Sequence, residues 1–132
     1  MSIQGDSRGP LGSAITVNLN AVGDTFVPIP CKQFIPRNIT VTNASVTLSG
    51  SASTIGVYTA PSAGGTAIVT PSVSTTLTSS TVFADKTIAA ATTVFTPTYD
   101  STAKAWGVYV RVAVVHGTAA TLDLYIFGDA IK

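Results

Sequence analysis

Strict alternation of side chains along the C-terminal third is the feature that most constrains the fold of this chain. Every second residue over 108–114 is a valine, and leucine and isoleucine recur with the same period over residues 121–127. A period of two is typical of a β-strand with one buried face. The sequence contains no Glu and is rich in Thr and Val, which disfavours long helices and favours strands. We therefore predict an all-β protein.

A short segment containing Gly117 separates the two alternating stretches, which predicts a β-hairpin. A register centred on this glycine sets Val108, Val110 and Val112 opposite Ile126, Leu124 and Leu122. On the other face it sets Tyr109 opposite Tyr125 and Arg111 opposite Asp123, with Phe127 beside them. Cross-strand pairs of this kind contribute about 0.2–1 kcal/mol each. Because this second face is partly apolar, we predict that its five residues form an interface with another sheet or subunit.

Further strands are predicted where shorter apolar segments lie between turn residues. They span residues 15–19, 25–30, 37–49, 53–60 and 67–69; apolar and polar residues alternate strictly in the first, and the fourth places Ile55, Val57 and Thr59 on one face. Pro28 and Pro30 place the second of these at a sheet edge, because proline donates no ladder hydrogen bond. A change of phase after Val41 predicts a bulge or turn at residues 43–45.

Residues 71–100 are dominated by Ser, Thr and Ala, but large apolar residues recur through them. We interpret this stretch as short ordered strands in preference to a linker. Many short strands without helical connections predict an antiparallel β-sandwich or barrel.

The length of 132 residues fits one domain, which we place at residues 14–132. Residues 1–13 are polar and contain Gly and Pro, so we predict a flexible N-terminal arm. The start of the chain lacks the basic and apolar regions of a signal peptide, and no run reaches the roughly 20 apolar residues of a membrane helix. The expectation is synthesis in a cytoplasm without a secretion signal, and no membrane partner.

Charge excludes one class of partner. Charged residues make up 10% of the chain, the formal net charge is +1, and the lysines and arginines are scattered. A nucleic-acid surface needs clustered cations, because affinity grows with the number of phosphates neutralised. We therefore expect no nucleic-acid partner.

The chemistry-bearing residues are few. His116 is the single histidine and lies in the predicted hairpin loop, and Cys31 is the single cysteine, interpreted as a small buried thiol. The aspartates lie beside turn residues or in predicted surface pairs. A triad needs a base beside a nucleophile, and a metal site needs clustered ligands. We expect no catalytic residue, cofactor or metal site, and predict that the protein is not an enzyme.

The aromatic residues leave two interpretations open. They are core and interface residues, or they form a platform on which sugar rings stack. The residues concerned are Trp106, Tyr58, Tyr99, Tyr109 and Tyr125.

Two stretches resemble small virion proteins of tailed bacteriophages, of the head decoration or capsid cement kind. One runs from residues 37–45 to residues 56–60 and the Gly-rich loop after them. The other runs from residues 109–112 through 119–121 to 124–129. The resemblance implies a jelly-roll-like β-sandwich that oligomerises, often as a trimer, on a capsid surface. It implies no reactive site.

The function expected from this resemblance is a structural virion protein that binds the outside of a phage capsid and bridges its capsomers. Its partners would be copies of itself, with a trimer favoured, and the major capsid protein. The alternatives are another virion component of the tail, neck or fibre, and a carbohydrate-binding or adhesin module.

Overall fold

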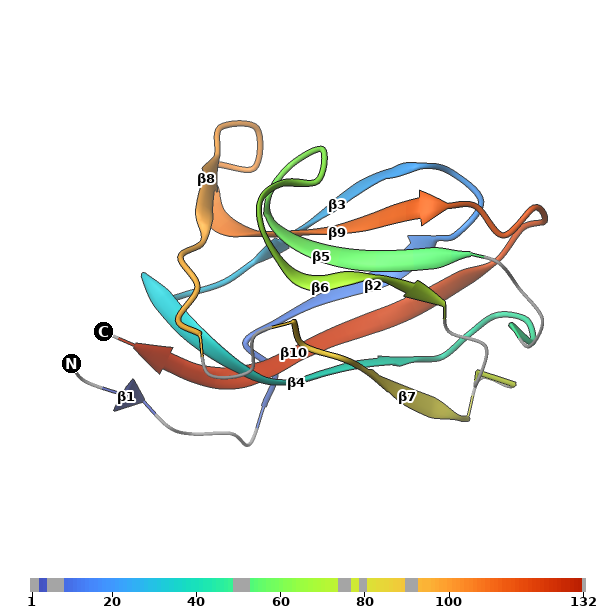
Figure 1. Ribbon diagram of the computed structural model, residues 1–132, viewed down its shortest axis with the longest axis horizontal. Helices are drawn as coiled ribbons and strands as arrows, with labels where there is room; N and C mark the ends of the chain where they lie inside the picture. Colours follow the sequence, from blue (N-terminus) through green and yellow to red (C-terminus); the bar gives the residue numbers. More distant parts are fainter. Residues whose placement is uncertain are drawn as a thin grey trace.

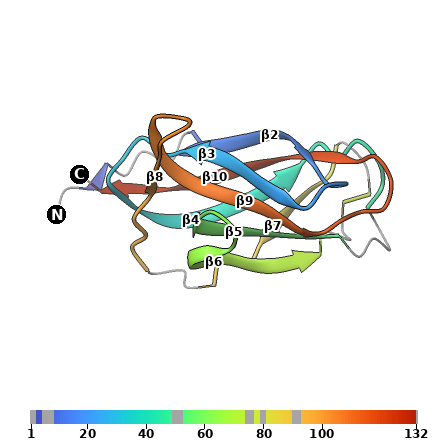
Figure 2. The same cartoon turned by 90° about the horizontal axis from the view of Figure 1, so that it is seen from above.

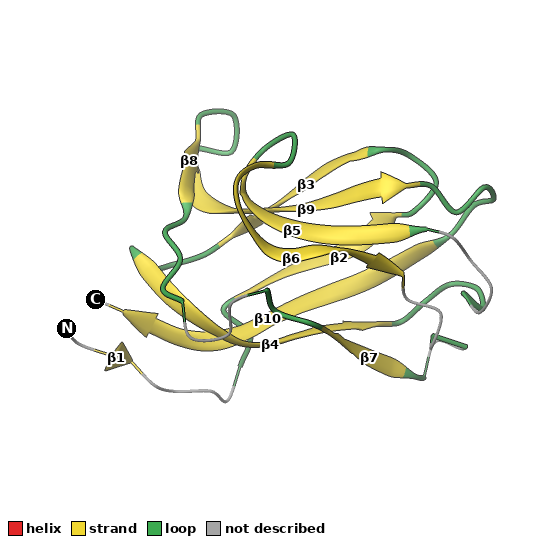
Figure 3. Cartoon of the chain, in the orientation of Figure 1, coloured by secondary structure: helices red, strands yellow, loops and turns green. Residues whose placement is uncertain are grey.

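The computed structural model describes residues 3–4, 9–48, 53–73, 77–78, 81–89 and 93–131. These residues form ten strands and no helix, arranged as two antiparallel sheets packed face to face (Figures 1 and 3). The long strands run along the length of the molecule, as the view from above shows (Figure 2). The predicted all-β antiparallel sandwich is confirmed.

Each sheet contains five strands. The first sheet, sheet A, has the order β1-β10-β4-β7, with β2 on the same side of β10 as β1. Its strands are β1 (Ile3–Gln4), β2 (Gly12–Asn18), β4 (Gln33–Thr42), β7 (Phe83–Lys86) and β10 (Thr121–Ile131). The second, sheet B, has the order β3-β9-β5-β6, with β8 pairing with β9. Its strands are β3 (Gly23–Pro28), β5 (Thr54–Ala60), β6 (Gly64–Val73), β8 (Thr98–Asp100) and β9 (Ala105–Val114).

The strand pairs are nested along the chain. Strand β2 pairs with β10, β3 with β9, β4 with β7, and β5 with β6. This is the order produced when one long antiparallel ribbon is rolled into two facing sheets. A double-sheet arrangement of eight such strands is the jelly roll.

The predicted hairpin between residues 108–115 and 121–127 is wrong. Strand β9 pairs with β3, β5 and β8 in one sheet, and β10 pairs with β1, β2 and β4 in the other. Rolling the ribbon sends these consecutive strands to opposite sheets, joined by residues 115–120. Both apolar faces still point inward, because Val108, Val110 and Val112 of β9 and the leucines of β10 belong to one core, whereas Val114 at the end of β9 is exposed.

That core fills the space between the sheets. Phe34 on β4 is fully buried and its ring lies 6.2 Å from that of Phe95. The backbones of these two residues also exchange hydrogen bonds of 3.0 and 2.8 Å, so the segment before β8 is tied to β4. The inner residues of β5 predicted from alternation, Ile55 and Val57, are buried as well.

Strand β2 contains a bulge that the alternation of residues 15–19 conceals. Thr16 has a φ of 57°, and the register with β10 shifts between Leu122 and Leu124. The extra residue turns Ile15 outward, where it is 54% exposed, while Val17 and Leu19 remain buried. One bulge therefore reverses the face of one predicted core residue.

Other predicted features agree with the structure. Strand β3 lies at a sheet edge and ends at Pro28. The turn expected at residues 43–45 follows the end of β4, and Asn43 takes the left-handed conformation that asparagine tolerates, with a φ of 55°. The predicted domain start at residue 14 differs from the structure, because strand β2 starts at Gly12.

The segment from 71 to 100 forms the end of β6 and the short strands β7 and β8. Leu77 and Phe95 are buried in the core, whereas Phe83 is exposed. Parts of the stretch, residues 74–76, 79–80 and 90–92, lie outside the described residues, as do most of residues 1–8 of the predicted arm.

Candidate functional site

The five residues predicted to share one interface lie on two separate surfaces. Tyr109 and Arg111 belong to β9 and face outward from sheet B, while Asp123, Tyr125 and Phe127 belong to β10 and face outward from sheet A. The outer faces of a sandwich point in opposite directions, so no single partner surface covers both groups.

Tyr109 is buried and already has partners within its own sheet. Its ring packs edge-on against Phe26 at a centroid distance of 5.4 Å, and its hydroxyl donates to Asp100 Oδ2 at 2.7 Å. Burial and the neighbouring Asp100 carboxylate raise the pKa of Tyr109 to about 12. The residue stabilises sheet B and offers little surface to a partner.

The predicted pair of Arg111 with Asp123 is wrong. Arg111 lies beside Asp24 on β3, and its Nη1 is 3.2 Å from Asp24 Oδ1. Asp123 is only 7% exposed and accepts hydrogen bonds from the Thr16 amide at 2.8 Å and from Asn43 Nδ2 at 2.9 Å. The carboxylate thus replaces the β10 backbone as the acceptor for the amide in the bulge of β2.

Tyr125 and Phe127 remain half-buried on the outer face of sheet A. Their neighbours in β4 are Thr40 and Asn38. Together these residues form a mixed polar and aromatic surface.

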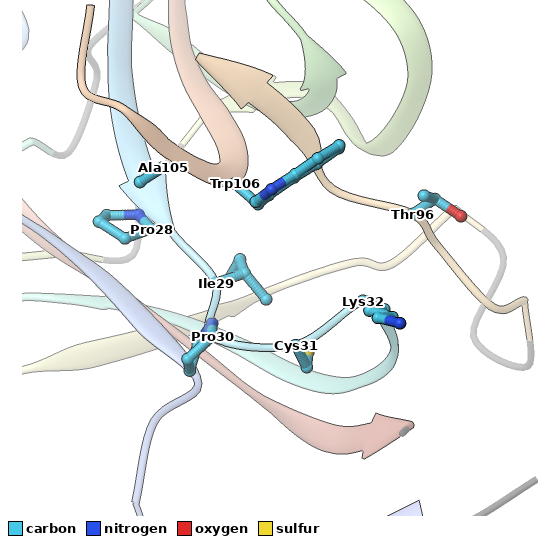
Figure 4. Close-up of a pocket in the computed structure, with 8 residues that line it drawn as sticks. All are labelled: Pro28, Ile29, Pro30, Cys31, Lys32, Thr96, Ala105 and Trp106. Carbon is cyan, nitrogen blue, oxygen red and sulfur yellow. The ribbon is translucent and has the colours of Figure 1, made fainter. Parts of the chain in front are cut away.

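A concave feature lies at one end of the sandwich, between the β3–β4 connection and the start of β9 (Figure 4). We call it the Trp106 pocket; it has a volume of about 750 Å³ and is lined by residues 28–32, Thr96, Ala105 and Trp106. Its size is within the range of small-ligand sites, roughly 300–1,000 Å³. Its walls are chiefly Pro, Ile, Ala and Trp side chains, which suits an apolar occupant.

Trp106 is held at the rim by its two neighbouring strands. It is 56% exposed, its ring packs edge-on against Tyr99 of β8 at 5.4 Å, and its carbonyl accepts from the Ile29 amide at 2.9 Å. Asp100 fixes the turn between β8 and β9 by accepting from the amides of Thr102 and Ala103. The indole is therefore presented on a rigid hairpin.

Trp106 and Tyr99 stand out in the sequence as aromatic residues, but no local pattern there indicates the pocket. Its other wall comes from Pro28 and Pro30, which appeared only as signs of a strand edge. The two segments are more than 70 residues apart in the chain, and their approach depends on the β3–β9 pairing.

The polar groups of the Trp106 pocket are few. Lys32 is exposed at the rim, and Cys31 is partly buried, which raises the pKa of its thiol. His116 lies in the β9–β10 connection at the opposite end of β9, so it cannot serve Cys31 as a base. The arrangement suits an apolar group beside a single cation, and its lining residues contain no nucleophile–base pair.

Two further features are absent from the described ranges. They contain no group of three or more His, Cys, Asp or Glu side chains placed to hold a metal ion. Nor does any helix of that part of the chain have the length and apolar character to cross a membrane.

Comparison with protein family models, with curated proteins and with solved structures finds no match to this chain.

Proposed function

We propose that this protein is a structural component of a tailed-bacteriophage virion that binds the outside of the capsid and bridges neighbouring capsomers. The observation that carries the proposal is the nested jelly-roll strand order, which is common in virus capsid domains and in lectins. The low content of charged residues, 10%, supports a protein whose surfaces lie against other proteins. The expected partners are copies of the chain, in a trimer, and the major capsid protein.

Capsid binding gives the direct test. The purified protein is mixed with heads of the encoding phage from which it has been omitted, and the heads are sedimented. We expect the protein to sediment with the heads at a fixed copy number and to raise the temperature at which they release DNA. The matched control is the same protein unfolded and mixed with the same heads. A protein that stays in the supernatant and leaves the release temperature unchanged contradicts the proposal.

A second function is favoured by one observation, the exposed Trp106–Tyr99 pair. Sugar rings stack on exposed aromatic side chains, and lectins also use the jelly roll. Trp106 is the only tryptophan, so its fluorescence reports on this site alone. Titration with a panel of monosaccharides and oligosaccharides is expected to leave the emission unchanged if the virion function holds. A saturable shift in the wild type, together with calorimetric binding that Trp106→Phe retains and Trp106→Ala abolishes, would establish the carbohydrate-binding alternative.

A further inference from the structure

The most exposed large apolar side chain in the described part of the molecule is Phe83, at 66%. It is the first residue of β7, where its Cα partner is Thr42 at the end of β4. A phenyl ring left in water on an edge strand loses the stabilisation that burial would give it. Phe83 is therefore a candidate anchor for a protein contact.

Asp85 lies two residues further along β7, on the same outward face as Phe83. Its Oδ1 accepts from Thr40 Oγ1 at 2.9 Å. This bond uses one of the two oxygens, and an ionised carboxylate has further acceptor sites. The face thus presents an aromatic ring followed by a carboxylate, which we call the Phe83 knob.

The Trp106 pocket has complementary chemistry. It offers apolar walls, an aromatic face and one charged side chain at the rim, the exposed Lys32. The apolar walls of the pocket suit an aromatic ring, and the positive charge of Lys32 suits a carboxylate beside that ring. Aromatic anchors that enter pockets are the usual centres of binding energy in protein interfaces.

The knob and the pocket of one chain cannot meet. Phe83 pairs with Thr42 at the end of β4, whereas Lys32 immediately precedes Gln33 at its start. The ten residues of β4 separate them by about 30 Å at 3.3 Å per residue. Any contact between the two must be made by a second molecule.

We propose that copies of this protein bind one another by inserting the Phe83 knob of one copy into the Trp106 pocket of the next, with Asp85 beside Lys32. Each copy has one knob and one pocket on different surfaces, so the contact is heterologous and closes when copies form a ring. The inference deepens the proposed virion function, because it names the contact through which its expected trimer forms.

The test is the mass of the full chain in solution, measured by light scattering behind a sizing column over a range of concentrations. The wild type is expected to form a closed oligomer. Phe83→Ser and Trp106→Ala are each expected to raise the dissociation constant at least about 30-fold, the effect of losing an interface anchor. Val22→Ser, at a comparably exposed apolar site in the β2–β3 turn, is the matched control and should leave the mass unchanged.

Charge reversal tests the pairing itself. Lys32→Asp and Asp85→Lys are each expected to weaken association about tenfold, and the double variant should restore it, because the two charges are exchanged. Trp106 emission supplies a second readout. It should shift to shorter wavelength as the wild type associates, and Phe83→Ser should remove that concentration dependence. Unchanged thermal unfolding at low concentration confirms that each variant is folded.

Three outcomes overturn the inference. The first is a wild type that is monomeric at all concentrations. The second is an oligomer that Phe83→Ser and Trp106→Ala both leave intact. The third is a double charge variant whose dissociation constant is no lower than those of the single variants. The capsid-binding measurement separates this failure from that of the proposed function. If the wild-type protein sediments with heads but the substitutions leave its oligomer unchanged, only the knob contact is rejected and the proposed function stands.

Discussion

The stability of the protein is expected to rise as the pH increases from about 8 to about 10. Lys86 lies on the inward face of β7 and is 6% exposed, and its Nζ donates to the carbonyls of Ser72 and Val73 at 2.8 and 3.2 Å. Burial disfavours the ammonium form and lowers the pKa of Lys86 from 10.5 to about 8.

The sign follows from proton binding in the two states. Between these two pKa values the unfolded chain holds a proton that the folded protein has released, so raising the pH favours the folded state. A difference from 10.5 to about 8 corresponds to about 3 kcal/mol of stability that is present above pH 10.5 and lost as the pH falls through 8. Tyr109 has the opposite effect, because its pKa rises from 10.0 in the unfolded chain to about 12 in the folded protein. Its contribution to the free energy of unfolding is therefore lost as the pH rises above 10. A stability maximum near pH 10 is therefore expected.

Urea unfolding midpoints at pH 7, 8, 9 and 10 measure this dependence. Lys86→Met is expected to remove most of the rise, whereas Lys104→Met, at an exposed lysine in the β8–β9 turn, should preserve it. Equal slopes for the wild type and Lys86→Met would show that the buried ammonium is not the cause.

The second large effect is expected at Asp123. In Asp123→Ala, the Thr16 amide in the bulge and the Asn43 side-chain amide both lose their acceptor. Thr16 and Asn43 are themselves exposed, so water replaces part of what is lost, and the loss of stability should reach about 1–3 kcal/mol, the contribution of one or two hydrogen bonds to a charged group.

Asp123→Asn is the matched control for this effect. Its oxygen still accepts from Thr16, and Asn43 can turn its amide so that its oxygen accepts from the new NH₂ group. The loss should fall below about half of that in Asp123→Ala, as measured by the urea midpoint at pH 7. An alanine variant as stable as the asparagine variant would mean that water or a rearranged bulge satisfies the Thr16 amide.

The buried carboxylate and the buried ammonium have related structural roles. Asp123 joins β10 to the bulge of β2 and to the turn after β4, and Lys86 joins the edge strand β7 of sheet A to β6 of sheet B. The Ala89 amide also donates to the Ile68 carbonyl at 2.8 Å, close to the same edge. These contacts occupy backbone groups of β6 that an edge strand otherwise leaves available for pairing with another chain.

The positions of most strands could be predicted from the sequence because the determining signals are local. Alternation identified the inner faces of β5, β9 and β10, and the change of phase after Val41 identified the turn at Asn43. Proline identified β3 as an edge strand. Each signal depends on the two-residue period of a strand or on the chemistry of a turn, so it needs no knowledge of distant neighbours.

The partner of each strand could not be predicted in this way. An arginine on β9 is equally well paired by an aspartate at position 24 or at position 123, and the valines of β9 pack equally well beside or across from the leucines of β10. Local alternation is the same in a hairpin and in two facing sheets, so the rolled connection between β9 and β10 was decided only by the whole set of nested pairs.

The sequence alone therefore determined the all-β class, the strand positions and most of the inward-facing residues. These features depend on the alternation of apolar and polar residues, which is a property of neighbouring positions in the chain. The tertiary structure decided which strands pair, where the bulge turns Ile15 outward, and how residues 28–32 meet Trp106 to form a pocket. Those features join segments that are distant in the chain, and their free energy depends on contacts that exist only once the ribbon has rolled into two sheets.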